Sequence, residues 1–136
     1  MHEIFGHTAD LGVRITAAGL PELFAEAGRA VLHVIAGDPT QVRAREVMTI
    51  EIAGDDPAWL LLDWIAELLA AFDLRRLLVS EFDVAISPAG LRATVRGERY
   101  DPARHVLAHD IKAVTQHDFD LHQTASGWEA TFILDI

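Results

Sequence analysis

The segment at residues 55–73, DDPAWLLLDWIAELLAAFD, constrains the fold more than any other part of the chain. Asp56 can accept a hydrogen bond from the free N–H groups of a first helical turn, and Pro57 suits the first helical position because it has no N–H to leave unpaired. Apolar residues then recur at helical spacing, and only Asp63, Glu67 and Ala70 mark a solvent-facing stripe. The pattern predicts a helix that is buried on most sides and covered by a sheet. Its acidic residues interrupt the apolar run well before the roughly 18 residues that a membrane span needs.

The remaining pattern predicts one further helix and several short strands. Leu20 to Ile35 has apolar residues at helical spacing, whereas other segments alternate between apolar and polar residues. Strands are expected at 2–6, 11–17, 47–53, 77–87, 90–97 and 128–134, with two more around 111–115 and 119–121. Residues 6–12 are expected to form a tight loop, and residues 98–109 a long irregular one.

These elements predict an α+β fold. Two main α-helices should pack in a two-layer sandwich with a β-sheet that is largely antiparallel or mixed. The chain of 136 residues, 51% of them apolar, fits one domain spanning 1–136. It has no cysteine, which excludes disulfides, thiolate metal ligands and a cysteine nucleophile. No signal-like segment follows Met1, so a cytoplasmic location without a membrane anchor is the expectation.

The charge is strongly acidic, with 21 acidic against 11 basic residues and a net charge of −10. The arginines are scattered along the sequence, and Arg75 and Arg76 are the only adjacent pair. Nucleic-acid binding usually needs clustered cations, so a basic macromolecular partner is easier to accommodate than bare RNA. The alternative is that the acidic surface serves solubility alone.

The common nucleotide and hydrolase motifs are absent from the sequence. It contains no GxxxxGK[ST], GxGxxG, GxSxG or HExxH pattern. We therefore expect no nucleotide to be bound and hydrolysed by this chain alone.

Carboxylates near both ends of the chain form a candidate cation site. Asp10 could satisfy its own loop backbone, and Asp135 with the terminal carboxylate of Ile136 could be a charged tail. If the last strand pairs near the first, these oxygens would converge and would suit Ca²⁺ or Mg²⁺. Without a cation, such like charges repel one another.

Two further features are the single lysine and a set of histidines. Lys112 is the only lysine of the chain, so a compact ammonium group can be required there, although an exposed strand lysine explains it equally well. Four histidines have spacings that overlap those of zinc motifs, but no cysteine accompanies them, and hydrogen-bonded or solvated histidines are the favoured reading. They are His105, His109, His117 and His122.

Several motifs taken together resemble the archease family. They are HTADLG near the start, LLLDWIAELLAAFD in the middle, Gly97-Glu98, IKAVTQH at 111–117, and a GW followed by a terminal DI. The resemblance implies a cytosolic accessory protein, not an enzyme, of the GTP-dependent RNA-splicing ligase of the RtcB type. Family members are thought to promote guanylylation and turnover of that ligase in tRNA splicing and RNA repair, and RNA would be contacted mainly through the ligase. Some are described as chaperone-like modulators of RNA-modifying enzymes.

Carried over by position, the family's metal site falls on Asp10, Asp135 and the Ile136 carboxylate. His7 and Lys112 match motif positions near the activating tip, and His117 is a further candidate for partner activation. The sequence departs from the family pattern at Ala66, where Asn is usual, and at Gln116, where Tyr is usual.

Three functions remain to be separated. The first is a metal-bearing activator of the ligase. The second is a stand-alone metal-dependent phosphoesterase that uses the same carboxylates. The third is a chaperone-like binding module.

Overall fold

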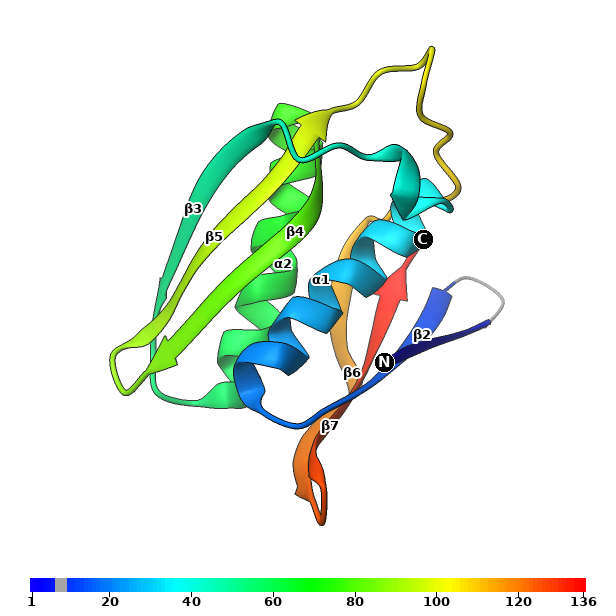
Figure 1. Ribbon diagram of the computed structural model, residues 1–136. Helices are drawn as coiled ribbons and strands as arrows, with labels where there is room; N and C mark the ends of the chain where they lie inside the picture. The colour runs from blue at the N-terminus through cyan, green and yellow to red at the C-terminus, as the bar shows by residue number, and fades with distance from the viewer. Residues whose placement is uncertain (7–9) are drawn as a thin grey trace.

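The computed structural model describes residues 1–6 and 10–136. Its strands, in chain order, are β1 (His2–Gly6), β2 (Asp10–Ala17), β3 (Glu46–Ala53), β4 (Leu77–Ser87), β5 (Gly90–Arg99), β6 (Ala113–Thr124) and β7 (Gly127–Asp135). Its helices are α1 (Leu20–Ala36), a short 3-10 turn (Pro39–Gln41) and α2 (Pro57–Arg75). The expected α+β class with two main helices is confirmed (Figure 1).

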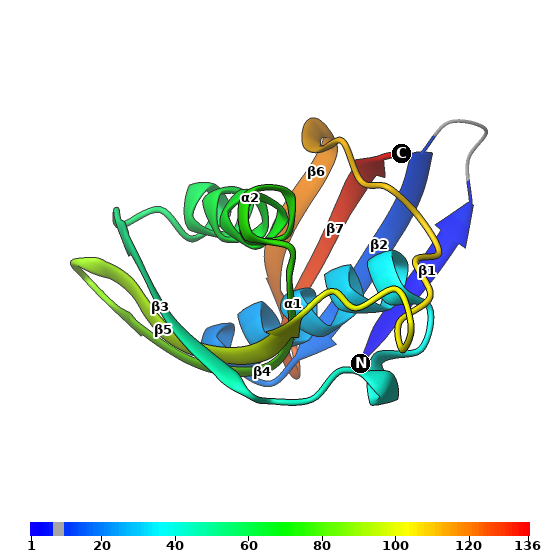
Figure 2. The ribbon, with the colours of Figure 1, turned by 90° about the horizontal axis from the view of Figure 1, so that it is seen from above.

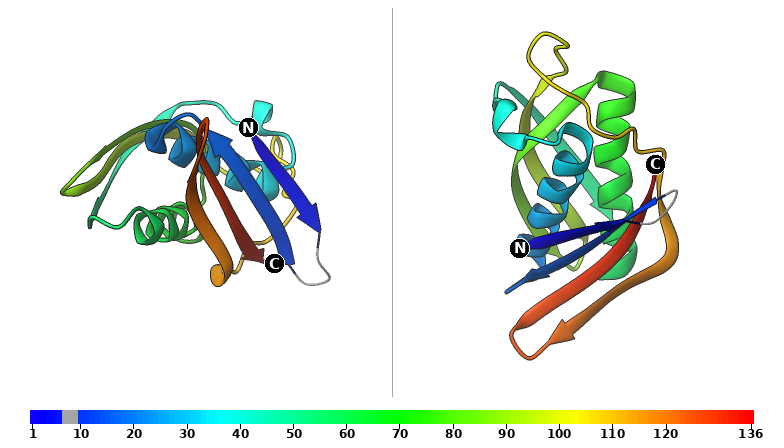
Figure 3. Two further views of the ribbon diagram at one scale, coloured as in Figure 1. Left: turned by 90° about the horizontal axis from the view of Figure 1, so that it is seen from below. Right: turned by 90° about the vertical axis from the view of Figure 1, so that its right-hand side faces the viewer.

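The strands form two separate sheets. One has the order β1-β2-β7-β6 and the other the order β3-β5-β4. Figure 3 shows the four strands of the first sheet side by side when the molecule is seen from below. Every strand pair among the described residues is antiparallel, so the mixed alternative does not apply.

Two predicted strands near the end of the chain are one strand. Residues 113–115 of the first segment and all of 119–121 fall on β6, whose pairing with β7 is interrupted between Thr115 and Asp120. Thr115 lies opposite Ile133 and Asp120 opposite Thr131, so four residues of β6 stand across from Phe132 alone. Such a bulge disturbs the period-two pattern, and this explains why the sequence reads as two short strands.

The two helices lie between the two sheets (Figure 2). Their apolar faces and the inner faces of both sheets share one core, whose largest fully buried side chains include Trp64, Phe24 and Phe132. The Trp64 Nε1–H donates to the Phe24 carbonyl at 2.8 Å, which joins α2 to α1 inside this core. The central helix is therefore the buried element that its sequence predicts.

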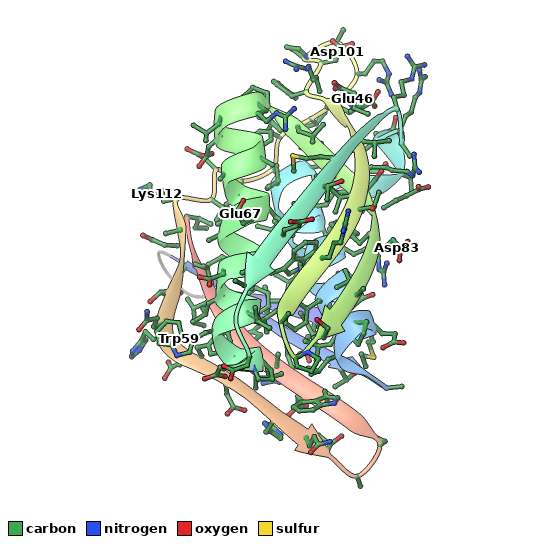
Figure 4. The ribbon with its side chains drawn as sticks, turned by 90° about the vertical axis from the view of Figure 1, so that its left-hand side faces the viewer. Glu46, Trp59, Glu67, Asp83, Asp101 and Lys112 are labelled. Carbon is green, nitrogen blue, oxygen red and sulfur yellow. The ribbon has the colours of Figure 1, made fainter. Side chains whose placement is uncertain are left out.

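The ends of α2 follow from its sequence. The Asp56 side chain accepts a hydrogen bond from the Ala58 N–H at 3.0 Å and caps the first turn. Arg76 ends the helix in the left-handed conformation, with φ of 53°, and its guanidinium lies 4.3 Å from the centre of the Phe72 ring. Asp63 and Glu67 are exposed on the side of α2 that faces solvent, and Figure 4 shows Glu67 and Trp59 along this side. No helix of the described residues is long and apolar enough to cross a membrane.

Candidate functional site

The two ends of the chain meet in the four-stranded sheet. Strand β2 pairs antiparallel with β7, and the register sets Asp10 directly opposite Asp135. Directly opposed residues of an antiparallel pair have Cβ atoms about 5 Å apart, with both side chains on one face. Figure 2 shows the start of β2, the end of β7 and the start of β6 at the same end of the sheet. Asp10 begins a strand, so the expectation that it lies in a loop is wrong.

The pair lies on the outer face of this sheet, away from the helices. Val13 and Ile15 of β2 are fully buried, and side chains alternate along a strand, so Asp10 belongs with the exposed Arg14 and Thr16. Asp10 is half-buried and Asp135 is exposed. A ligand at these carboxylates would therefore be reachable from solvent.

Lys112 and Ile136 border the carboxylate pair. Ala113, the first residue of β6, also lies opposite Asp135, and the Lys112 N–H donates to the Asp135 carbonyl at 2.7 Å. The Lys112 side chain is exposed, and Figure 4 shows it at the start of β6. Ile136 follows directly, and its half-buried side chain packs against the core. The backbone thus brings Asp10, Asp135, Ile136 and Lys112 to one corner of the sheet.

The residues at this corner fit a hard cation by their chemistry. Asp10, Asp135 and the Ile136 carboxylate offer oxygen ligands only, which Ca²⁺ and Mg²⁺ prefer. Among residues 1–6 and 10–136, no group of three or more His, Asp or Glu side chains is arranged to hold a metal. A cation here would need a donor in addition to the two aspartate side chains, and the Ile136 carboxylate is the one that the sequence indicates. The metal ligands stay a prediction.

The other candidate residues are not all at this corner. His7 lies outside the described residues. His117 is exposed within the irregular part of β6, and its Nε2 lies 3.2 Å from the Asp118 carboxylate. It lies in the bulge that follows Thr115, the residue of β6 that pairs with Ile133. Its role in partner activation therefore stays a prediction that the carboxylate pair does not support.

Within residues 1–6 and 10–136, the histidines with zinc-like spacing belong to no group of three or more side chains that could hold a metal. His105 is buried, and both of its ring nitrogens form hydrogen bonds. Nδ1 accepts a hydrogen bond from the Asp101 N–H at 2.9 Å, and Nε2 contacts the Glu98 carboxylate at 2.8 Å. His122 Nδ1 lies 2.5 Å from the Asp120 carboxylate in the exposed part of β6. These contacts explain His105 and His122 as hydrogen-bonded histidines, the reading that the sequence favours.

A buried ionic network fixes the chain before Lys112, and sequence reasoning missed it. Glu98 lies at a buried position of β5. The sequence predicts it instead as the first residue of an irregular loop. Its carboxylate accepts hydrogen bonds from Arg104 at 2.9 and 3.0 Å, from His105 Nε2 at 2.8 Å and from the Arg43 N–H at 3.0 Å. Because Asp101 donates to Nδ1 of His105, Nε2 carries the proton that this bond requires.

The same contacts set the charge state of Glu98. Burial alone raises the pKa of the Glu98 carboxyl, but the bonds from Arg43, His105 and Arg104 outweigh it and lower the pKa to about 2. Arg104 and His105 also contact the Gln41 carbonyl, at 3.0 and 3.2 Å. The network thus ties the segment 100–112 to the segment after α1. The signal in the sequence was the Gly97-Glu98 pair, whose function could not be read without the fold.

Comparison with known proteins finds one protein family that this chain matches over nearly its whole length. A family model described as the Archease protein family matches residues 2–136. A protein archease of Sulfurisphaera tokodaii is 35% identical over 136 residues, covering 98% of this chain and 97% of the relative. A protein archease of Pyrococcus abyssi is 33% identical over 139 residues, with the same coverage of both chains.

Two solved structures have a similar fold. The solution structure of Protein 1598 of Methanobacterium thermoautotrophicum matches with a TM-score of 0.82 at 33% identity, covering 99% of this chain and 98% of that one. The crystal structure of a Thermotoga maritima protein described as an archease and possible chaperone matches with a TM-score of 0.70 at 18% identity, over 100% and 98% of the two chains. At this low identity, the similarity to the Thermotoga maritima protein shows a shared fold and nothing more.

Proposed function

This chain belongs to the archease family, and from that premise we propose that it activates a GTP-dependent RNA-splicing ligase of the RtcB type. In this proposal the protein is an accessory factor that promotes guanylylation and multiple turnover of the ligase. The observation that carries the proposal is the cross-strand pair of Asp10 and Asp135, with Lys112 beside it. The family resemblance assigns Asp10 and Asp135 to the metal site and Lys112 to a position near the activating tip.

The sheet explains how residues from opposite ends of the chain can act together. The register holds Asp10 and Asp135 in place through backbone hydrogen bonds of two paired strands, so neither depends on a loop for its position. A divalent cation bound there with the Ile136 carboxylate would offset the repulsion between these charges and present positive charge to phosphate oxygens. Lys112 supplies a compact ammonium group at the same corner, suited to an anionic group of the partner site.

The acidic surface supports docking on the ligase. An enzyme that binds RNA carries basic surface near its active site, and a protein with a net charge of −10 complements it. Such complementarity speeds association and makes it dependent on salt. RNA would then be contacted mainly through the ligase.

A chaperone-like module is the second candidate. It is favoured by the description of the Thermotoga maritima protein with this fold as a possible chaperone. It predicts suppression of client aggregation with or without a divalent cation. The phosphoesterase alternative predicts instead that the purified protein hydrolyses phosphate esters with Mg²⁺ and no ligase.

The decisive experiment is ligation by the cognate ligase with this protein added in substoichiometric amounts. We expect multiple turnovers with the wild-type protein, and single turnover with Asp10→Ala or Lys112→Ala. The control is Arg14→Ala, on the same face of the sheet, whose exposed side chain pairs with Glu3 at 3.1 Å. Unchanged turnover with both test variants would contradict the proposal.

A further inference from the structure

The structure gathers arginines that are scattered in the sequence. Six of the eleven basic residues come from three segments, 43–46, 75–76 and 98–104, which contain only three of the 21 acidic residues. The arginines are Arg43, Arg45, Arg75, Arg76, Arg99 and Arg104. We call this region, where α2 ends, β4 starts and β5 ends, the arginine end.

Backbone contacts bring the three segments together. The Arg45 N–H donates to the Gly97 carbonyl at 2.8 Å, and the Tyr100 N–H donates to the Arg76 carbonyl at 2.7 Å. Arg99 lies opposite Leu77 in the β4–β5 pair. Figure 4 shows Glu46 and Asp101 at this end of the molecule, amid many nitrogen-bearing side chains.

Four of the six guanidinium groups are committed neither to a buried carboxylate nor to an aromatic ring, and of these Arg75 donates from Nη1 to the Met48 sulfur, a weak acceptor, at 2.9 Å. Arg104 is committed to the buried Glu98, and Arg76 lies over the rings of Phe72 and Tyr100, at 4.3 and 5.3 Å. The side chains of Arg43, Arg45, Arg75 and Arg99 are exposed. Arg99 has a long contact of 3.5 Å with Glu46, and such an exposed pair contributes little.

We propose that the arginine end binds the phosphate backbone of RNA directly. This inference rests on the proposed function, which brings RNA and the protein together on one ligase. In the proposed function, the corner that holds Asp10 and Asp135 faces the ligase. The arginine end is built from other elements, so it stays accessible to RNA. The expectation from the sequence, that scattered arginines disfavour RNA, does not take account of this clustering.

The side chains at this end favour phosphates over bases or a protein. Among the described residues, three large apolar side chains beside these arginines are exposed, namely Val47, Leu74 and Val106, and Tyr100 is half-buried beneath Arg76. Three isolated aliphatic side chains are too few for the apolar centre of a stable protein interface. Without an exposed aromatic ring there is no platform for base stacking, so binding should not depend on the RNA sequence.

The test is titration of a fluorescent, unstructured RNA of about 20 nucleotides with the protein alone, followed by anisotropy. We expect saturable binding at low salt, weakening with a log–log slope of about −3 if four phosphates are contacted. Two variants each lower the net charge by three. The test variant is Arg45→Gln, Arg75→Gln and Arg99→Gln. The control is Arg14→Gln, Arg29→Gln and Arg92→Gln.

The test variant should bind at least about tenfold more weakly and reduce the salt slope by about two. The control should lose less than about threefold, through net charge alone. Replacing the three test arginines by lysine should retain most of the binding, which shows that these positions tolerate substitution and that binding follows their charge. No saturable binding at low salt, or equal loss in both triple variants, would overturn the proposal.

A competition separates RNA from an acidic protein. Polyglutamate of matched charge should displace the RNA poorly, and equal displacement would overturn the RNA assignment in favour of an acidic polypeptide. Because the titration contains no ligase, its failure is distinct from failure of ligase activation. If ligase activation fails while the RNA binds, the proposed function is refuted and the arginine end is still an RNA-binding surface.

Discussion

Replacing Glu98 by Gln should destabilise the protein measurably. Glu98→Gln keeps the size of the side chain but removes the charge that Arg104, His105 and the Arg43 N–H contact. A lowering of the Glu98 pKa from 4.5 to about 2 corresponds to about 3 kcal/mol of linkage free energy. The Arg104 side chain is 30% exposed, so solvent screens part of this interaction. We therefore expect a loss of about 2 kcal/mol in the free energy of unfolding at pH 7.

The effect should depend on pH in one direction. The pKa of Glu98 is lower in the folded than in the unfolded chain, so the stabilisation is complete above about 4.5 and is lost as the pH falls towards 2. Urea unfolding of wild type and Glu98→Gln, measured between these limits, should show the difference in free energy shrinking steadily with falling pH.

A matched control removes an exposed carboxylate from the same sheet. Glu51→Gln breaks a 3.5 Å contact with Arg92, in which both side chains are more than half exposed. It should change the free energy of unfolding by less than about 0.5 kcal/mol. A stabilising role of the Glu98 charge would be refuted if Glu98→Gln behaved like this control, or if its effect were the same at every pH.

Three other substitutions test the fold, each by urea unfolding. Gly97→Ala should cost about 2–3 kcal/mol, because a Cβ at Gly97 would lie 1.8 Å from the Leu78 carbonyl oxygen; a change below about 0.5 kcal/mol would show that β4 can move away. Trp64→Phe should cost about 2–3 kcal/mol, since it leaves the buried Phe24 carbonyl without its donor and opens a cavity. Asp56→Ala should cost about 1 kcal/mol through loss of the helix cap, and no loss would mean that solvent replaces it.

Elements whose sequence signals are local were predicted well. The α2 helix has a cap, a proline at its first position and a helical apolar pattern, and it forms with the burial that these predict. The hairpin of β4 and β5 follows from alternation and turn residues in the same way. These signals need no knowledge of distant residues, which is why they suffice.

Features that depend on contacts between distant residues were not predictable. The bulge in β6 depends on its register against β7, and the division into two sheets depends on how both helices pack. Glu98 reads as one more charged residue until Arg43 and Arg104 are brought to it from either side along the chain. The arginine end is likewise visible only after the chain has folded.

The candidate cation site was partly predictable. The sequence indicates Asp10, Asp135 and Ile136 by charge and by resemblance, on the condition that the last strand pairs near the first. The structure satisfies the condition for Asp10 and Asp135 through β2 and β7. The ligand set itself, and the roles of His7, Lys112 and His117, await measurement.

Calorimetric titration of Ca²⁺ into the purified protein tests directly whether the paired ends of the chain bind a cation. We expect one site that is weakened at least about tenfold by Asp10→Asn, by Asp135→Asn and by extension of the chain beyond Ile136, with Mg²⁺ as competitor. The control Asp120→Asn, on the exposed part of β6, should bind as the wild type does. Equal affinity in all of these proteins, or no binding of either cation to the wild type, would contradict the claim that the paired ends of the chain form a cation site.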